Sequence, residues 1–276
     1  MEKAYVSRET LSATDKEDLK RVAVALADAA RAAILPLFRS INLALENKAD
    51  QGFDPVTHAD KAAERAMRAI LEAQRPEDGI LGEEYGEISG SSGLTWVLDP
   101  IDGTRSFMSG TPTWGVLIAL RDAAGPFFGV IDQPYIGERF IGGLGLNTMA
   151  GPLGAAALQT RSTRALKDAL LFSTFPEIGS RAEHASFQAV AKQVKLVRYG
   201  LDCYAYALLA AGQIDLVIEA GLSAYDVQAP IAVIEAAGGV VCNWQGRPAH
   251  DGGQIIAAAT PELMAAALPL LQNARL

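Results

Sequence analysis

The segment that most constrains this chain is WVLDPIDGTRSF, residues 96–107, in which a hydrophobic strand runs directly into two aspartates. Asp99 and Asp102 lie three residues apart, and Pro100 between them makes the turn rigid because its ring fixes φ. Two like charges held close together repel each other unless a cation lies between them. Carboxylate oxygens with no His or Cys nearby are ligands for Mg²⁺, Mn²⁺ or Ca²⁺ rather than for zinc. The segment therefore predicts a strand that ends near Leu98 at a site for a hard divalent cation.

Gly103 and Thr104 follow the second aspartate at once. Glycine lets a backbone approach an anion closely, and the exposed N–H groups at a helix start bind phosphate. A carboxylate pair joined to such a cradle predicts metal-assisted chemistry on a phosphate group.

Length, charge and cysteine content limit the domain organisation, the partners and the cellular location that we expect for this protein. A chain of 276 residues suits one large domain or two halves that share a core. The balance of 24 basic and 32 acidic residues gives a net charge of −8, and no run of Lys and Arg is interleaved with aromatics, so we expect no nucleic-acid partner. No apolar run reaches the roughly 18–20 residues of a membrane span, and the charged N-terminus does not resemble a signal peptide. With only Cys203 and Cys242 as cysteines, we expect a cytoplasmic protein without a disulfide framework or a membrane partner.

Hydrophobic periodicity and turn residues predict a mixed α and β fold in two interlocked halves with a boundary near residue 150. In the first half we expect helices over 14–38, opened by a capping box at Thr14–Glu17, and over 60–74. Strands are expected over 80–81, 95–98, 114–120, 127–132 and 139–142, the last three as an antiparallel meander. In the second half, strands over 170–173, 195–199, 214–219 and 240–244 accompany helices over 202–211, over 226–237 and from Thr260-Pro261 onward.

Further carboxylates lie at the edges of these elements. Asp60 begins the second helix, Glu83 and Glu84 follow a short strand, and Asp226 begins a later helix. Each of them alone is most simply a helix cap or a solvated charge. A purely structural Ca²⁺ site at DPIDG is another alternative, but it leaves Glu83 and Asp226 unexplained.

Three motifs resemble the inositol-monophosphatase superfamily of Mg²⁺-dependent, lithium-sensitive phosphatases. They are GEEYG (82–86), WVLDPIDGTRSF (96–107) and YDVQAP…EAAGG (225–239), and they occur in the family's order. The similarity spans nearly the whole chain, and it implies a layered αβαβα sandwich, a small-molecule phosphate monoester as substrate and a homodimer. One departure is Tyr225, where the family usually has Trp, and this change should alter packing more than metal ligation.

Carried over by position, the resemblance implies a set of metal ligands and a set of catalytic residues. The ligands of two or three Mg²⁺ (or Mn²⁺) ions would be Glu83, Asp99, the Ile101 carbonyl, Asp102 and Asp226. Asp60 and Thr104 would steer the attacking water, with Glu83 as the third catalytic residue, and hydrolysis would proceed without a covalent intermediate. Glu84 would be a neighbour of the site, and Lys48 matches a basic family position but is equally well read as a solvated lysine. Residues 1–150 would then carry most metal ligands, and residues 151–276 the substrate wall and the last ligand.

The stretch RYGLDCYAYALLAAGQIDLVIEAGL (198–222) resembles the histidinol-phosphatase branch, in which an Asp-Cys-Tyr run lies at the substrate wall. Arg105 also matches that branch, since inositol enzymes often have Thr there. L-histidinol phosphate carries an ammonium group and an imidazole, so its pocket should add carboxylates, and Asp202 and Glu219 are available, with a helix cap as the alternative for Asp202. The expected phosphate- and substrate-binding residues are Gly103, Thr104, Arg105, Asp202, Glu219 and Asp226.

Other side chains near these motifs are expected to be structural. Cys203, Tyr204 and Tyr206 are most simply helix-packing residues, and the three histidines (His58, His184 and His250) are scattered. Hydrolysis of inositol 1-phosphate, or of a related sugar phosphate, is the alternative activity. A third alternative is an accessory protein that binds RNA or RNA polymerase, and the acidic charge argues against it.

Overall fold

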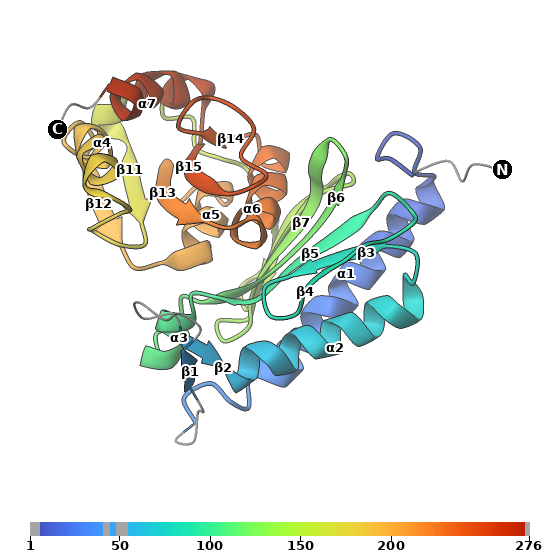
Figure 1. Cartoon of the computed structure of the whole chain (residues 1–276). Helices are drawn as coiled ribbons and strands as arrows, with labels where there is room; N and C mark the ends of the chain where they lie inside the picture. Colours follow the sequence, from blue (N-terminus) through green and yellow to red (C-terminus); the bar gives the residue numbers. More distant parts are fainter. Residues whose placement is uncertain (1–5, 41–44, 48–54, 274–276) are drawn as a thin grey trace.

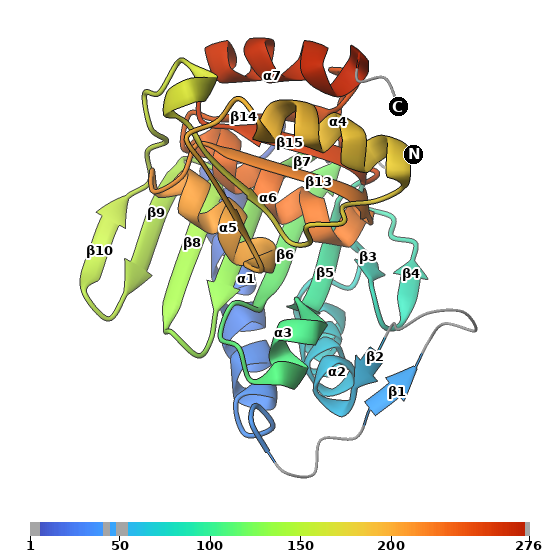
Figure 2. The same ribbon diagram turned by 90° about the vertical axis from the view of Figure 1, so that its left-hand side faces the viewer.

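The computed structural model describes residues 6–40, 45–47 and 55–273. These ranges form five layers in the order helix, sheet, helix, sheet, helix (Figures 1 and 2). The expected layered αβαβα sandwich is therefore confirmed.

The first outer layer is α1 (Ala13–Ile34) and α2 (His58–Gln74), which pack against each other and on one face of the larger sheet. That sheet has the strand order β10-β9-β8-β7-β6-β5-β3-β4, and all its neighbours are antiparallel except β3 and β5. Its strands are β3 (Gly79–Gly82), β4 (Gly86–Ile88), β5 (Thr95–Asp102), β6 (Gly115–Asp122), β7 (Gly125–Gln133), β8 (Glu138–Gly143), β9 (Leu146–Gly151) and β10 (Gly154–Ala157).

The middle layer is α5 (Asp202–Ala210) and α6 (Ala224–Ala236), which separate the two sheets (Figure 2). The smaller sheet has the order β12-β11-β13-β15-β14, with β11 (Leu170–Ser173), β12 (Leu196–Tyr199), β13 (Leu216–Leu222), β14 (Val240–Asn243) and β15 (Gly253–Ala258). The last layer is α4 (Arg181–Ala191) and α7 (Pro261–Asn273). Shorter elements are the β1 (Leu45–Asn47) and β2 (Pro55–Thr57) pair, helix α3 (Thr104–Ser109) and a 3₁₀ turn at Leu166–Asp168.

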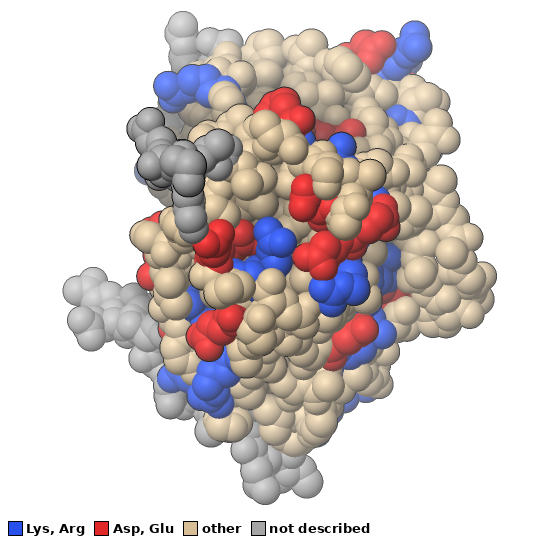
Figure 3. Space-filling model, turned by 90° about the vertical axis from the view of Figure 1, so that its right-hand side faces the viewer, with Lys and Arg blue, Asp and Glu red and all other residues tan. Residues whose placement is uncertain are grey.

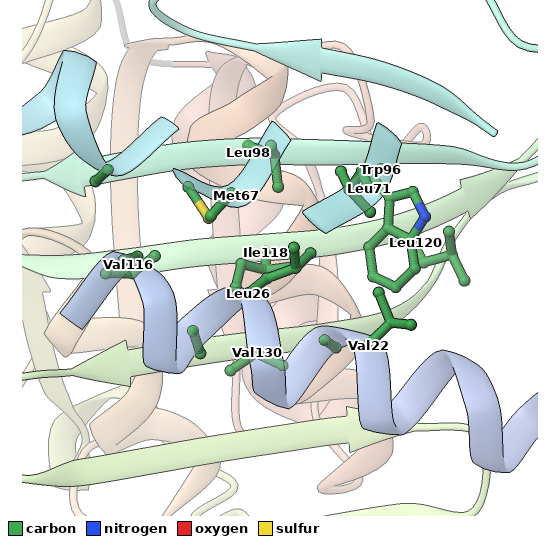
Figure 4. Close-up of a cluster of buried hydrophobic side chains, with 14 of the residues drawn as sticks. Val22, Leu26, Met67, Leu71, Trp96, Leu98, Val116, Ile118, Leu120 and Val130 are labelled. Atoms are coloured by element: carbon green, nitrogen blue, oxygen red, sulfur yellow. The ribbon is translucent and has the colours of Figure 1, made fainter. Parts of the chain in front are cut away.

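The central strands β5, β6 and β7 of the larger sheet are buried on both faces, and the strand sequences show why. In β5, Trp96 and Leu98 point to the α1/α2 layer while Val97 points to the α5/α6 layer, because successive side chains of a strand alternate between faces. Figure 4 shows the cluster on the first face, where Val22 and Leu26 of α1 meet Met67 and Leu71 of α2 over the sheet. Strand β5, which carries Asp99 and Asp102 at its C-terminal end, is thus held in place by apolar packing on both faces.

Helix α6 packs directly on the backbone of the larger sheet. A Cβ atom at Gly142 of β8 would lie 2.5 Å from the Cα of Val233, closer than real Cβ contacts, so a side chain there would push the helix away. This close approach fixes where the first turn of α6, with Asp226, lies relative to β5 and β6.

Several expectations need correction. The capping box of α1 is formed by Ser12 and Asp15 rather than by Thr14 and Glu17: Ser12 Oγ accepts from the Asp15 N–H (3.1 Å), and Asp15 Oδ2 accepts from the Ser12 N–H (2.9 Å). Strand β5 does not end at Leu98 but continues to Asp102. The strands β4, β9, β10 and β15 and the helix α4 were not expected, whereas the antiparallel meander of β6, β7 and β8 is confirmed.

On the face shown in Figure 3, acidic and basic side chains lie among one another. Within the described ranges, no helix is both long enough and apolar enough to span a bilayer.

Candidate active site

A β-bulge brings Asp99 and Asp102 to the same place. Asp99 pairs with Leu117 and Asp102 with Gly115, so β5 takes three steps where β6 takes two. Residues an odd number apart on a regular strand point to opposite faces, and one extra residue reverses that relation. Pro100 lies within the bulge, where the ladder does not need its missing N–H. The two carboxylates of the DPID segment therefore lie close together because β5 has a bulge between them, and not because the strand has ended.

The other expected carboxylates come from three neighbouring element ends. Glu83 follows β3, which runs parallel to β5, and the Glu83 N–H donates to the Leu98 carbonyl oxygen (3.2 Å), so Glu83 lies beside Asp99. Asp60 is in the first turn of α2 and Asp226 in the first turn of α6. One carboxylate oxygen from each of Asp99, Asp102 and Asp226 lies within 4.8 Å of the others.

Burial among like charges strongly perturbs this cluster. The pKa of Asp99 is raised well above its usual value, first by burial and then by Glu83, Asp102, Asp226 and Asp60 in that order. Burial also raises the pKa of Asp102, where Asp226 adds the next effect, and burial raises the pKa of Asp226.

Asp99, Asp102 and Asp226 have no compensating cation in the described part of the chain. There, Asp99, Asp102 and Asp226 form no ion pair with Lys or Arg, and Asp99 Oδ1 is buried without a hydrogen-bond partner. Buried like charges with an unused oxygen are what a hard divalent cation would satisfy, so the donor set fits such an ion.

Gly103 and Thr104 form the turn that follows the bulge. Gly103 has φ +88°, and a Cβ there would lie 2.8 Å from Cγ of Asp202, so both the backbone conformation and the close approach of α5 require glycine. Thr104 begins α3, and its hydroxyl donates to the Ile101 carbonyl oxygen (3.2 Å). Helix α3 is held by the Phe107 ring, which packs on Trp114 with a centroid separation of 5.0 Å.

Asp202 faces this turn instead of capping its own helix. The N-cap of α5 is Leu201, with no side-chain cap, and Asp202 is the next residue, with φ +46°. Asp202 Oδ2 accepts from the Ser106 hydroxyl (2.5 Å) and from the Thr113 hydroxyl (3.4 Å). The helix-cap interpretation of Asp202 is therefore wrong. Its neighbour contributes too, because the Cys203 N–H donates to Asp102 Oδ2 (2.6 Å).

Glu219, in the middle of β13, is 5% exposed. Its Oε1 accepts from the Thr174 N–H (2.6 Å) and the Thr174 hydroxyl (2.9 Å), and the Ser173 hydroxyl donates to Oε2 at 3.4 Å. Burial raises the pKa of Glu219 to about 7, although the bonds from Thr174 oppose that rise.

A cavity of 270 Å³ connects these groups. It is lined by Asp102, Gly103, Thr104, Arg105, Thr174, Phe175, Asp202, Cys203, Tyr206, Glu219, Ala220, Gly221, Leu222 and Asp226. All six expected phosphate- and substrate-binding residues are in this lining, whereas Asp60, Glu83 and Asp99 are not.

Some expected residues lie elsewhere. None of the three histidines lines the cavity; His58 is exposed at the start of α2, and His250 lies beside Gly125 in the β6–β7 turn. Lys48 lies outside the described residues. Tyr204 is a structural residue whose hydroxyl donates to Glu138 Oε2 (2.6 Å), whereas Cys203 and Tyr206 pack in the core and also line the cavity.

The sequence reasoning missed Glu64, which supports the turn after β3. Glu64 is fully buried in α2, pairs with Arg68 (2.8 Å) and accepts from the backbone N–H groups of Glu84 (2.7 Å) and Tyr85 (3.2 Å). The turn that presents Glu83 is thus fixed to α2. The available signal was an acidic and a basic residue four apart on the buried face of a helix.

Comparison with known proteins identifies the class to which this fold and site belong. The sequence profile of the inositol monophosphatase family matches residues 15–276. The chain belongs to the inositol monophosphatase family, and it is a phosphoric monoester hydrolase.

Individual relatives agree with that assignment. The chain is 43% identical to the bifunctional phosphatase IMPL2, chloroplastic, of Arabidopsis thaliana, over 86% of this chain and 67% of that protein. It is 34% identical to the histidinol-phosphatase of Streptomyces coelicolor, over 88% of this chain and 93% of that protein. Among solved structures, an inositol monophosphatase from Zymomonas mobilis has a TM-score of 0.82 and 41% sequence identity, with coverage of 95% of this chain and 100% of the other.

Proposed function

We propose that this protein is a Mg²⁺-dependent phosphatase whose main substrate is L-histidinol phosphate. The observation that carries the substrate is the pair of carboxylates, Asp202 and Glu219, that line the cavity beyond the metal-binding cluster. Both are held by hydroxyl donors, Asp202 by Ser106 and Glu219 by Thr174. A neutral polyol does not require two further negative groups, whereas an ammonium and an imidazole do. The identity to the histidinol-phosphatase of Streptomyces coelicolor supports the same substrate.

The residues that would hold Mg²⁺ are Glu83, Asp99, Asp102, Asp226 and the carbonyl of Ile101. Bound Mg²⁺ supplies a water of lowered pKa and stabilises the oxygen of the leaving alcohol. The oxygen-only donor set and the unused Asp99 Oδ1 support a hard cation.

The chain's own catalytic groups are Asp60, Thr104 and Glu83. In this proposal Asp60 and Thr104 orient the attacking water, and Glu83 holds its position through the bond from its N–H to the Leu98 carbonyl. The Gly103–Thr104 turn and Arg105 bind the phosphate, since these three residues line the cavity where α3 begins.

Inositol 1-phosphate is the second candidate substrate, and the likeness to the Zymomonas mobilis inositol monophosphatase favours it. A phosphate-release assay on the purified protein separates the two. We expect kcat/KM for L-histidinol phosphate to exceed the values for inositol 1-phosphate and glycerol 2-phosphate by at least about 10-fold, and EDTA to abolish all three activities. Faster release from inositol 1-phosphate would contradict the substrate, and activity that survives EDTA would contradict the metal.

Four wider properties belong to the same proposal. Residues 1–150 supply most of the metal ligands, and residues 151–276 supply the substrate wall and Asp226. The protein is a cytoplasmic homodimer, and Li⁺ inhibits it. Size-exclusion chromatography with light scattering tests the dimer, and a Li⁺ titration of activity tests the inhibition.

A further inference from the structure

A second cavity adjoins the one described above. Its volume is 260 Å³, and it shares Arg105, Phe175, Glu219 and Ala220 with the first cavity. Its remaining lining comes from Glu177, Ile178 and Gly179 in the loop between β11 and α4. Only the first cavity reaches Asp102 and Asp226. An ester whose phosphate lies at the carboxylate cluster therefore extends its leaving group toward the shared wall.

Phe175 is the aromatic residue of that shared wall. Its side chain is 42% exposed, which is unusual for a large apolar residue beside charged groups. The preceding residue, Thr174, donates two hydrogen bonds to Glu219, and the Ile178 N–H donates to the Phe175 carbonyl oxygen (3.3 Å). Hydrogen bonds thus fix the backbone at Thr174 and at Phe175, and they hold the Phe175 ring in the wall that the two cavities share.

The ring already accepts a flat, nitrogen-bearing group. The Arg105 guanidinium lies over it, with Cζ 4.8 Å from the ring centroid. An imidazole is also planar and nitrogen-bearing, and an aromatic face binds such a group by stacking and, when the group is protonated, by cation–π attraction. Glu219 in both cavities and Glu177 in the second are the carboxylates available to its N–H groups.

We infer that Phe175 is a specificity-determining residue whose ring stacks on a planar, basic leaving group at the boundary of the two cavities, with Glu219 paired to the same group. This inference rests on the proposed function and names the part of the leaving group, its imidazole, that the distal wall recognises. A polyhydroxylated ring such as inositol has neither an aromatic π system nor a positive charge, so it lacks the aromatic stacking and the cation–π attraction that Phe175 offers an imidazole.

The test compares Phe175→Leu with the wild type on L-histidinol phosphate, inositol 1-phosphate and glycerol 2-phosphate. We expect kcat/KM for L-histidinol phosphate to fall about 5-fold, mainly through KM, because Leu keeps the volume but lacks the aromatic face. The other two esters should change less than 2-fold. The inhibition constant of L-histidinol against glycerol 2-phosphate hydrolysis should rise by the same factor of about 5, and Phe175→Trp should restore both values.

Phe127→Leu is the matched control. Phe127 carries a similar pair, with Arg8 Cζ 5.0 Å from its ring centroid, but it lies in β7 near the end of that strand away from the carboxylate cluster. This variant should match the wild type on all three esters.

The possible failures are distinguishable. Equal losses on all three esters would make Phe175 a structural residue, and wild-type kcat/KM for L-histidinol phosphate in Phe175→Leu would remove its role while leaving the proposed substrate intact. A wild-type enzyme that neither hydrolyses L-histidinol phosphate nor is inhibited by L-histidinol would overturn both, and this would be visible before any variant is made.

Discussion

Replacing Glu219 by Gln should stabilise the protein above neutral pH while it weakens the enzyme. Glu219 is 5% exposed, and its burial raises its pKa from 4.5 to about 7. The native state thus retains a proton that the unfolded chain releases at lower pH. Glutamine is neutral at every pH and can still accept the two hydrogen bonds from Thr174.

The sign and size of the effect follow from proton linkage. A carboxyl whose pKa is raised by folding contributes its full stability below pH 4.5, and that contribution is lost as pH rises toward about 7. Because each pKa unit is worth about 1.4 kcal/mol, the wild type should lose about 3 kcal/mol over this window relative to Glu219→Gln. The difference should be small at pH 4.5, grow to about 3 kcal/mol by pH 8 and stay constant above that.

Urea denaturation of both proteins in EDTA between pH 4.5 and 8.5 measures this difference. Other carboxyls that titrate in this range are common to both proteins, and their contributions cancel except for that of Asp202, whose charge acts on Glu219. Glu183→Gln is a control of opposite sign: the Ser180 N–H and then Gln254 lower the pKa of Glu183, so its ionised form stabilises the fold above the ordinary Glu pKa, and its removal should destabilise the protein at neutral pH. A free-energy difference between wild type and Glu219→Gln that does not change with pH would refute the reasoning. In the same variant, kcat/KM for L-histidinol phosphate should fall by roughly 10- to 150-fold, the value of a charge-assisted hydrogen bond.

Three other substitutions test the site. Asp99→Asn should leave less than a tenth of the activity at saturating Mg²⁺ but raise the melting temperature in EDTA, because it removes one of several repelling charges; retained activity would contradict ligation by Asp99. Thr104→Ala should lower kcat by roughly 10²-fold with KM nearly unchanged, whereas a large rise in KM with normal kcat would make the hydroxyl a phosphate contact instead. Asp202→Asn should lower kcat/KM for L-histidinol phosphate by roughly 10- to 150-fold and leave glycerol 2-phosphate nearly unaffected, and equal losses on both esters would show that Asp202 supports the fold or the metal cluster.

The sequence predicted those parts of the fold that local patterns determine. Strands β6, β7 and β8 carry dense apolar residues between Gly, Pro and Asp turns, so their order and antiparallel pairing could be predicted. The hairpin of β9 and β10 could not, because β10 reads GAAA with every residue exposed and has neither alternation nor β-branched residues. It is a strand only because β9 provides its hydrogen-bonding partner.

The start of α1 was predicted wrongly because two overlapping segments both match the same capping pattern. Ser12–Asp15 and Thr14–Glu17 both match the capping-box pattern. The structure selects the first because Leu11 is buried in the core cluster, and its burial fixes where the chain enters the helix. Contacts between distant segments decide such cases, and one sequence does not contain them.

In the candidate site too, the motifs predicted some features, and others depend on contacts between distant segments. Motif resemblance supplied the carboxylates, but not the β-bulge that makes an odd spacing converge, and not the support of the β3 turn by Glu64. Thr174 and Phe175 were missed because they belong to no motif. They enter the site only because β11 lies parallel and adjacent to β13, which carries Glu219.

Stability and function oppose each other throughout this site. Asp99, Asp102, Asp226 and Glu219 all have a raised pKa through burial, so each of them destabilises the ionised native state. The strands and helices that carry these four carboxylates are held in place by the apolar packing of the two sheets. In the described ranges, this packing keeps Asp99, Asp102 and Asp226 close together although no Lys or Arg is paired with them. The four carboxylates nevertheless fall into two groups with different remedies. A divalent cation can relieve the three that converge within 4.8 Å, whereas Glu219 lies outside that group beside Thr174, where a proton or a cationic part of a ligand can relieve it. Burial thus places two kinds of carboxylate in this site, the three for which we propose metal ligation and Glu219, for which we propose selection of the ester.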